Sequence, residues 1–196
     1  MFSNAGPGGE ESLKRWYLEV HGPDALQNGT FTGLHLYEAV GPYDARFLAL
    51  WEGRYRSLDE ARIGIVPNAT GLRDRGRVAS DLLVLWSSLS FLTGATLVDH
   101  QEAVVTFSVI EGGVFEPTDA SVYRYGDIEF CESSAMAAHS RRGWEECARE
   151  GIAPLGAYRN MFESPESWMS ERLSVGEPWV SQWTPVGSLR VEDLQQ

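Results

Sequence analysis

The order of hydrophobic patterns between residues 10 and 66 constrains the fold of this chain more than any other feature. Apolar residues follow a helical period over 10–21 and alternate over 32–40. Residues 47–52 are rich in aromatic and aliphatic side chains, and a capping-box pattern opens a second helix over 57–65. A helix, two strands and a second helix in this order form the interior of a β-α-β-β-α-β unit. The first half of the chain is therefore predicted to be an α+β unit of the ferredoxin-like class.

The first helix is predicted from one apolar stripe. Its members recur at steps of three and four residues: Leu13, Trp16, Tyr17 and Val20. This spacing places them on one face of an α-helix, where they can pack against a sheet. Gly22-Pro23 follows, and a proline disfavours helical geometry in the residue before it. We therefore expect the helix to end at Val20 or His21.

The two strands are predicted to form a hairpin. Alternation over 32–40 assigns residues to two faces, with Gly33, His35, Tyr37 and Ala39 on one and Leu34, Leu36 and Val40 on the other. The turn-forming segment Gly41-Pro42-Tyr43-Asp44 joins this strand to the next one, over 47–52. Ser57 with Glu60 then matches the capping box that opens the second helix.

The second half of the chain repeats this alternation of elements loosely, without repeating the residues. Strands are predicted over 103–110, 121–130, 154–162 and 179–191, and helices over 133–150 and 165–173. The apolar run 80–91 fits either a helix or a buried strand, because so short a run cannot distinguish them. Two tandem ferredoxin-like units are therefore an alternative to one, with residues 1–100 as the first and residues 101–196 as a divergent second unit.

Composition narrows the class of protein. Of the 196 residues, 43% are hydrophobic and 11% are aromatic, which suffices for a packed core. The net charge of −12 argues against a nucleic acid or an anionic membrane as partner, because phosphate contacts need clustered Lys and Arg. The chain starts without a signal-peptide pattern, and its most apolar stretch, 82–92, is shorter than the about 20 residues that a bilayer requires. We therefore expect a cytoplasmic protein.

An ordered set of short motifs spans residues 1–52, roughly a quarter of the chain. In chain order they are Phe2-Ser3-Asn4, Pro7-Gly8, Glu10-Glu11, Trp16-Tyr17, Glu19-Val20-His21, Pro23-Asp24 and Arg46-Phe47-Leu48-Ala49-Leu50-Trp51-Glu52. Together they resemble the EthD-type, stress-responsive family of dimeric α/β barrels. Asn28-Gly29-Thr30-Phe31 stands where that family has a Pro-Gly-Phe turn. The opening strand is short by comparison, because Met1 lies almost at the position where the family's strand ends.

The resemblance implies both a fold and a class of activity. In this family a ferredoxin-like unit presents a four-stranded sheet, and two sheets close a barrel around an apolar cavity, by dimerisation or by tandem duplication. Several members carry out cofactor-independent cyclisation, dehydration, decarboxylation or isomerisation of small aromatic or polyketide-like compounds, and many others have no established activity. The resemblance therefore implies a homodimer that takes a small apolar or aromatic ligand and needs no cofactor.

His21 is the first candidate for a catalytic acid/base. It lies one helical turn after Tyr17 and three residues before Asp24, at the expected end of the helix. The helix dipole and the nearby carboxylate would both raise the pKa of its imidazole, and Asp24 would also fix its tautomer. Tyr17 would then help to bind the substrate. Alternatively, His21 only caps the helix and hydrogen-bonds Asp24, which holds the loop in shape.

His35 and Tyr37 form a second candidate site, because they share one strand face. If that face lines the barrel, the pair offers two directed hydrogen-bonding groups that could polarise a carbonyl or hold a phenol. If the face packs against a helix, the pair is only part of the core. Trp51, or its neighbour Leu50, would project onto the same cavity from the next strand and contact the ligand by packing.

The sequence predicts no metal or cofactor site. Neither Cys131 nor Cys147 has a metal-binding spacing, and neither His100 nor His139 has a second ligand three or four residues away. Haem binding, known for some tandem ferredoxin-like barrels, ranks last among the alternatives. Two hypotheses lead: a cofactor-free lyase or isomerase with His21 as general acid/base, and a non-catalytic small-molecule-binding or accessory protein with the same barrel.

Overall fold

The computed structural model describes the N-terminal quarter of the chain completely and the remainder in segments. The described residues are 1–56, 60–61, 63–65, 71–72, 74–80, 82–86, 91–93, 104–111, 120–125, 128–133 and 179–195. Their strands are β1 (Phe2–Ala5), β2 (Gly33–Ala39), β3 (Phe47–Glu52), β4 (Leu82–Trp86), β5 (Phe91–Thr93), β6 (Val105–Glu111), β7 (Ala120–Tyr125), β8 (Ile128–Ser133) and β9 (Trp179–Arg190). They form an α+β structure with one antiparallel sheet, in the order β4-β1-β3-β2-β9-β6-β7-β8-β5.

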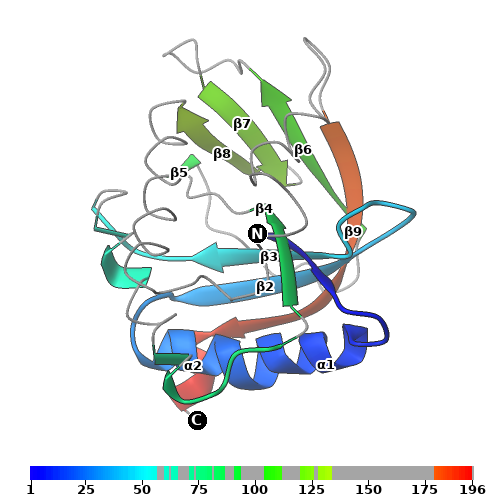
Figure 1. Cartoon of the computed structure of the whole chain (residues 1–196). Coiled ribbons are helices and arrows are strands. Elements are labelled where there is room, and N and C mark those ends of the chain that lie inside the picture. Colours follow the sequence, from blue (N-terminus) through cyan, green and yellow to red (C-terminus); the bar gives the residue numbers. More distant parts are fainter. Residues whose placement is uncertain are drawn as a thin grey trace.

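One continuous helical segment connects β1 to β2 and lies along one face of the sheet (Figure 1). It consists of α1 (Glu10–Arg15), the π-helix η1 (Trp16–His21) and α2 (Gly22–Gln27). The prediction that the helix ends before Gly22-Pro23 is wrong. A wider π turn, in which the Gly22 N–H donates to the Tyr17 carbonyl, precedes the proline. Pro23 then occupies the first turn of α2, where its missing N–H is tolerated.

The predicted hairpin is confirmed. Strands β2 and β3 pair antiparallel, with Gly33 opposite Glu52 and Glu38 opposite Phe47. Gly41 in the connection has a φ of +112°, a conformation that favours glycine. The undecided run 80–91 contains a strand, β4.

The first four strands are adjacent in the sheet. Strand β1 pairs antiparallel with both β3 and β4, which gives the order β4-β1-β3-β2. Helical residues at 60–61 and 63–65 follow β3, as predicted for this position. Ser57, the expected cap, lies outside the described residues. Glu60 accepts a hydrogen bond from the Arg56 N–H, at 2.6 Å.

The core has two layers, one on each face of the sheet. The layer under the helices, here called the helix face, contains Leu13, Trp16, Tyr17, Leu34, Leu36, Phe47, Ala49, Leu72, Leu82 and Val84. The layer on the other side, here called the opposite face, contains Phe2, Tyr37, Ala39, Ala45, Leu48, Leu85, Val105, Phe107 and Trp183. The predicted alternation in β2 is confirmed, since Leu34 and Leu36 pack under the helices and Tyr37 and Ala39 pack on the other side.

Strand β9 joins the two halves of the chain. It pairs with β2 over most of its length and with β6 at its start, so strands from both predicted units share one sheet. The predicted strands at 103–110 and 179–191 are confirmed as β6 and β9.

The single strand predicted over 121–130 is wrong, because this region forms β7 and β8, paired as a hairpin with Tyr125 opposite Ile128. The sequence has the turn-favouring dipeptide Gly126-Asp127 between them. Ser133 ends β8, and the elements predicted beyond it, up to residue 173, lie outside the described residues.

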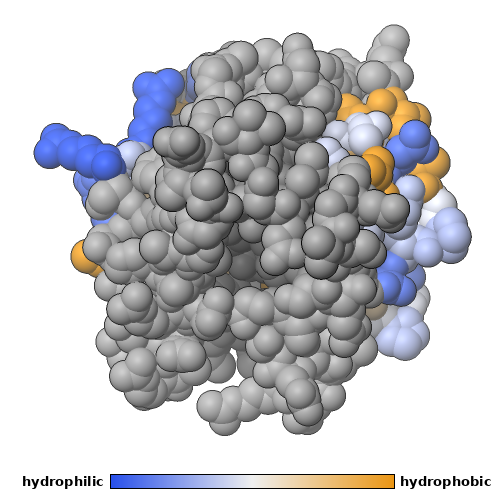
Figure 2. All heavy atoms as spheres, turned by 90° about the horizontal axis from the view of Figure 1, so that it is seen from above, coloured by the Kyte–Doolittle hydropathy of each residue, from blue (hydrophilic) through white to orange (hydrophobic). Residues whose placement is uncertain are grey.

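The surface of the described part is mixed. Figure 2 shows hydrophobic and hydrophilic side chains exposed together at the right of the view. The exposed large hydrophobic side chains are Val40, Ile63, Val104 and Val180. Within the described residues, no helix is both long enough and apolar enough to cross a membrane.

Candidate functional site

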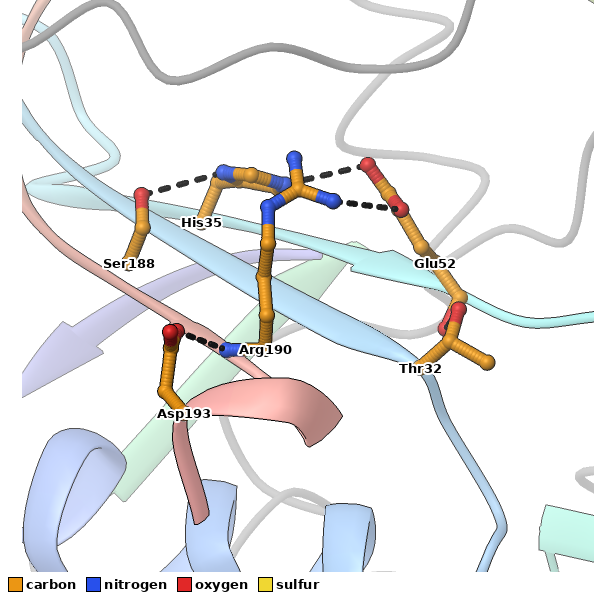
Figure 3. Close-up of polar contacts among 6 residues, drawn as sticks. All are labelled: Thr32, His35, Glu52, Ser188, Arg190 and Asp193. Atoms are coloured by element: carbon orange, nitrogen blue, oxygen red, sulfur yellow. Dashed lines mark hydrogen bonds and ion pairs between the residues drawn. The ribbon is translucent and has the colours of Figure 1, made fainter. Parts of the chain in front are cut away.

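A chain of polar side chains centred on His35 lies on the opposite face of the sheet, away from the helices (Figure 3). His35 is completely buried. Its Nδ1 lies 3.0 Å from the Ser188 Oγ, and its Nε2 lies 3.1 Å from Glu52 Oε1. Arg190 Nη1 lies 3.6 Å from the other carboxylate oxygen of Glu52. Three neighbouring strands, β3, β2 and β9, therefore bring a hydroxyl, an imidazole, a carboxylate and a guanidinium together.

The strand register explains how this group assembles. Ser188 is the direct cross-strand partner of His35, whereas Glu52 and Arg190 both lie opposite Gly33. Glu52 must therefore lean along its strand to reach His35 on the diagonal, a distance that a long side chain can cover. A Cβ built on Gly33 would lie 3.3 Å from Glu52 Oε2. The absence of a side chain at Gly33 leaves the space in which the Glu52 carboxylate sits.

Hydrogen bonds at the strand ends fix the backbone that carries Glu52 and Arg190. The Arg190 N–H donates to Asp193 Oδ2 at 3.0 Å, just where β9 gives way to the 3₁₀-helix η3 (Val191–Gln195). On the other side, the Thr32 hydroxyl donates to the Glu52 carbonyl at 3.4 Å. Both contacts hold the strand ends from which Glu52 and Arg190 project. The side chains thus start from well-defined positions.

The hydrogen bonds assign roles to the two ring nitrogens of His35. A carboxylate can only accept hydrogen bonds, so the Nε2–H donates to Glu52. In the neutral ring, Nδ1 then carries the lone pair and accepts the hydrogen of the Ser188 hydroxyl. Such an imidazole, with a carboxylate behind it, can take up a proton at Nδ1 while Glu52 stabilises the positive charge that forms.

The rest of the opposite face is apolar and aromatic. Tyr37, the other member of the predicted pair, is 2% exposed and packs with Phe2, Leu48 and Trp183. Leu50 lies directly opposite His35 on β3 and borders the same cluster. Trp51 does not face this site, because β3 alternates and directs it to the helix face. The prediction that Trp51 shares a cavity with His35 is therefore wrong, and Leu50, the named alternative, takes that position.

His21 lies elsewhere, on the helix face, inside a group of aromatic rings. Its ring stacks on Trp16, with centroids 4.6 Å apart, and also contacts Trp51 at 4.8 Å and Tyr17 at 6.2 Å. Its Nδ1 is buried and has no hydrogen-bond partner in the described part of the chain. Burial lowers the pKa of His21 from 6.5 to about 3. The predicted rise is wrong, because the helix continues past His21 and the ring is removed from water.

Asp24 does not orient His21. Its buried carboxylate pairs instead with Arg75 at 3.2 Å and with Arg77 at 3.3 Å. Trp16 Nε1 donates to the Arg77 carbonyl at 2.6 Å, so the same segment is held to the helix twice. Asp24 therefore anchors residues 75–77 to the helical segment, and the expected His21–Asp24 pair is not formed.

Tyr17 is also part of the core. It is fully buried, and its hydroxyl lies 3.2 Å from the Ser3 Oγ. Burial raises the pKa of this phenol, an effect that the hydrogen bond to Ser3 only partly opposes. The side chain thus stabilises the contact between the helix and β1, and is not placed to contact a ligand on the opposite face.

Within the described residues, no group of three or more His, Cys, Asp or Glu side chains could hold a metal ion. His100 and His139 lie outside these residues. Sequence reasoning found His35 and missed its partners. Glu52 could have been predicted, because the predicted hairpin already placed it two residues after Leu50 on the same face. Ser188 is 153 residues away from His35 along the chain, and no local pattern indicates such a contact.

Comparisons of the chain with family models, with curated proteins and with solved structures found no match. The geometry around His35 is therefore the basis for assigning a function.

Proposed function

We propose that this chain is a cofactor-independent enzyme of the lyase, isomerase or cyclase type, acting on a small aromatic or polyketide-like compound with His35 as its acid/base. The observation that carries the proposal is the position of the His35 imidazole between a carboxylate and a hydroxyl, 3.1 Å and 3.0 Å away. Buried carboxylate–imidazole pairs are typical of proton-transfer sites. Leu50 lies directly opposite His35 and borders the apolar, aromatic cluster of this face, and side chains of this kind suit a ligand of that class.

In this proposal the substrate replaces the Ser188 hydroxyl at Nδ1. Ser188 is only half-buried, so a change of its rotamer can free the nitrogen. Nδ1 then takes a proton from a carbon next to a carbonyl and returns it elsewhere on the substrate. Glu52, with Arg190 behind it, holds the Nε2–H and stabilises the imidazolium. General acid–base catalysis of this kind contributes about two to four orders of magnitude in rate.

The proposal includes the fold expected from the resemblance to the EthD-type family. The strand order β4-β1-β3-β2, with the helical segments on one face, is the order expected of a ferredoxin-like unit and supports this part of the proposal. We propose further that the barrel is completed either by the second half of the chain or by a homodimer. Light scattering would distinguish these, since a homodimer has twice the mass of the 21.8 kDa chain. The cytoplasm remains the compartment predicted from sequence.

A non-catalytic binding protein is the second candidate. The complete burial of His35 favours it, because a histidine with no exposed surface and a partner on each side is also suited to joining β3, β2 and β9. On this alternative, the opposite face binds an apolar compound and releases it unchanged.

Deuterium exchange tests the proposal without knowledge of the natural substrate. 2-Tetralone, an aromatic ketone with acidic α-hydrogens, would be incubated with the protein in D₂O and followed by proton NMR. We expect exchange faster than in buffer, and a loss of about two to four orders of magnitude in His35→Gln. His21→Gln is the matched control and should exchange at the wild-type rate.

Two results would go against catalysis by His35. Wild-type exchange in a folded His35→Gln variant would remove this residue from the reaction. Binding of 2-tetralone, detected by quenching of tryptophan fluorescence, without any exchange above buffer would favour the non-catalytic alternative.

A further inference from the structure

The hydroxyl, imidazole and carboxylate around His35 also occur in the order that activates a serine. The Ser188 Oγ lies 3.0 Å from Nδ1, and the Glu52 carboxylate lies 3.1 Å from Nε2 on the far side of the ring. A nucleophilic serine needs a base within hydrogen-bond reach and a third group that orients this base. Ser188, His35 and Glu52 satisfy both conditions. The chain order of such groups is irrelevant, because this arrangement recurs on unrelated folds.

The two ends of this series are less buried than its centre. His35 is completely buried, and the Glu52 side chain is 12% exposed. Ser188 belongs to a partly exposed stretch of β9. The base is therefore shielded from water, and of the two partly exposed groups beside it the hydroxyl is the one that can act as a nucleophile. Shielding strengthens the interaction between the carboxylate and the imidazolium that forms.

The serine is also held in register. It is the direct cross-strand partner of His35, so the two side chains project from the same position on adjacent strands. The bulge in β9 lies between the positions paired with Leu36 and Tyr37, just before this pair. A bulge reverses the face on which the following residues project, and it therefore directs Ser188 toward His35.

We propose that Ser188 is the nucleophile of an acyl-transfer activity toward small esters of apolar acids. This proposal rests on the same His35–Glu52 pair as the proposed function and adds a covalent step. The Ser188 Oγ forms a bond to the ester carbonyl carbon, and its proton passes to His35 Nδ1. The bond from that carbon to the alcohol oxygen breaks, and the departing alcohol takes the proton from His35.

Water completes the cycle. It attacks the acyl-serine, with His35 Nδ1 taking one of its protons, and the bond to the Ser188 Oγ breaks. The serine oxygen recovers the proton from His35, and a carboxylic acid leaves. Ester and water are thus converted to acid and alcohol, with no oxidant, reductant or cofactor required. Glu52 is a positioning residue in this scheme, since it acts only through His35.

The test uses the full chain with two probes, p-nitrophenyl butyrate and a fluorophosphonate. We expect a burst of p-nitrophenolate and one fluorophosphonate adduct per chain, located by mass spectrometry on Ser188. Ser188→Ala should abolish both, and His35→Gln should slow both by about two to four orders of magnitude. Ser12→Ala, which removes an exposed hydroxyl from α1, is the control and should behave as wild type.

Each other result overturns the proposal. An adduct on another residue, or none, excludes Ser188 as nucleophile, and so does ester cleavage that persists in Ser188→Ala. Exchange into 2-tetralone separates this failure from that of the proposed function. Exchange is therefore measured on the wild-type chain beside the adduct. Exchange without an adduct would therefore leave proton transfer by His35 standing and remove only the covalent step.

Discussion

At the scale of single residues, the two histidines of the N-terminal region differ mainly in their partners. His35 lies between a hydroxyl and a carboxylate, whereas His21 lies among aromatic rings with its Nδ1 unpaired within the described residues. A buried nitrogen without a hydrogen bond destabilises the fold, and a charge on that ring would destabilise it more. Protonation of His21 thus affects the stability of the fold rather than a reaction.

This difference predicts that His21 makes the free energy of unfolding sensitive to acid. Its pKa is about 3 in the folded chain against 6.5 for an ordinary histidine. Between these two values the unfolded chain binds a proton that the folded chain does not. The contribution of His21 is therefore fully favourable above pH 6.5 and is lost as the pH falls toward 3, by about 1.4 kcal/mol per pH unit.

His21→Phe isolates that contribution. Phenylalanine can stack on Trp16 and cannot be protonated, so the variant should lose less stability on acidification than the wild type. Urea unfolding of both proteins at pH 4, 5, 6 and 7 measures the difference, because carboxylate effects common to both cancel. Parallel stability curves would show that His21 is protonated in the folded chain.

Residue-level prediction from sequence succeeded where a local pattern existed. Alternation in β2 placed His35 and Tyr37 on one face, which the structure confirms. The same reasoning could have added Glu52. The pairing of Asp24 with Arg75 and Arg77 and the contact of His35 with Ser188 depend on long-range packing, for which a single sequence carries no signal.

At the scale of elements, the helical segment shows where a local rule was overridden. Gly22-Pro23 normally ends a helix, yet α1, η1 and α2 form one continuous segment. The π turn spans five residues between donor and acceptor instead of four, which widens the helix just before the proline. Tertiary packing then keeps the chain in place. A Cβ on Gly22 would lie 2.6 Å from the Tyr17 carbonyl oxygen and 2.5 Å from Leu189 Cδ1. Glycine is thus required for close packing against β9.

Two glycine substitutions in helical positions test this explanation. Gly22→Ala should lower the free energy of unfolding by about 1–3 kcal/mol, because the added methyl group meets backbone. Gly71→Ala is the matched control, since the nearest atom to its Cβ would be Arg75 Nη2 at 3.6 Å. It should be neutral or stabilising by up to about 1 kcal/mol. Equal effects in thermal or urea unfolding would contradict the close packing at Gly22.

At the scale of the whole molecule, β9 joins strands from both halves of the chain in one sheet. It pairs with β2 and β6 and contributes Trp183. This tryptophan is fully buried, and its ring centroid lies 5.5 Å from that of Phe2. Trp183 Nε1 donates to the Ser181 Oγ, which in turn donates to the Phe107 carbonyl. The strand itself was predictable from its β-branched and aromatic residues. Its place next to β2 was not, because strand order depends on contacts far apart in the sequence.

This connection predicts cooperative unfolding of the sheet. Trp183→Ala should lower the free energy of unfolding by about 3–5 kcal/mol and shift one transition, seen alike by tryptophan fluorescence and by circular dichroism. Two separate transitions, of which only one moves, would indicate that residues 1–100 and 101–196 fold independently.

The most direct test of the central claim is the protonation state of the His35 ring. Both proposals require a proton on Nε2, held by Glu52, and an unprotonated Nδ1 facing Ser188. Two-bond ¹H–¹⁵N correlation NMR at neutral pH distinguishes protonated from unprotonated ring nitrogens, and His35→Gln assigns the signals. We expect the Nε2–H tautomer in the wild type. A ring protonated on Nδ1 alone would place the lone pair toward Glu52 and contradict the account.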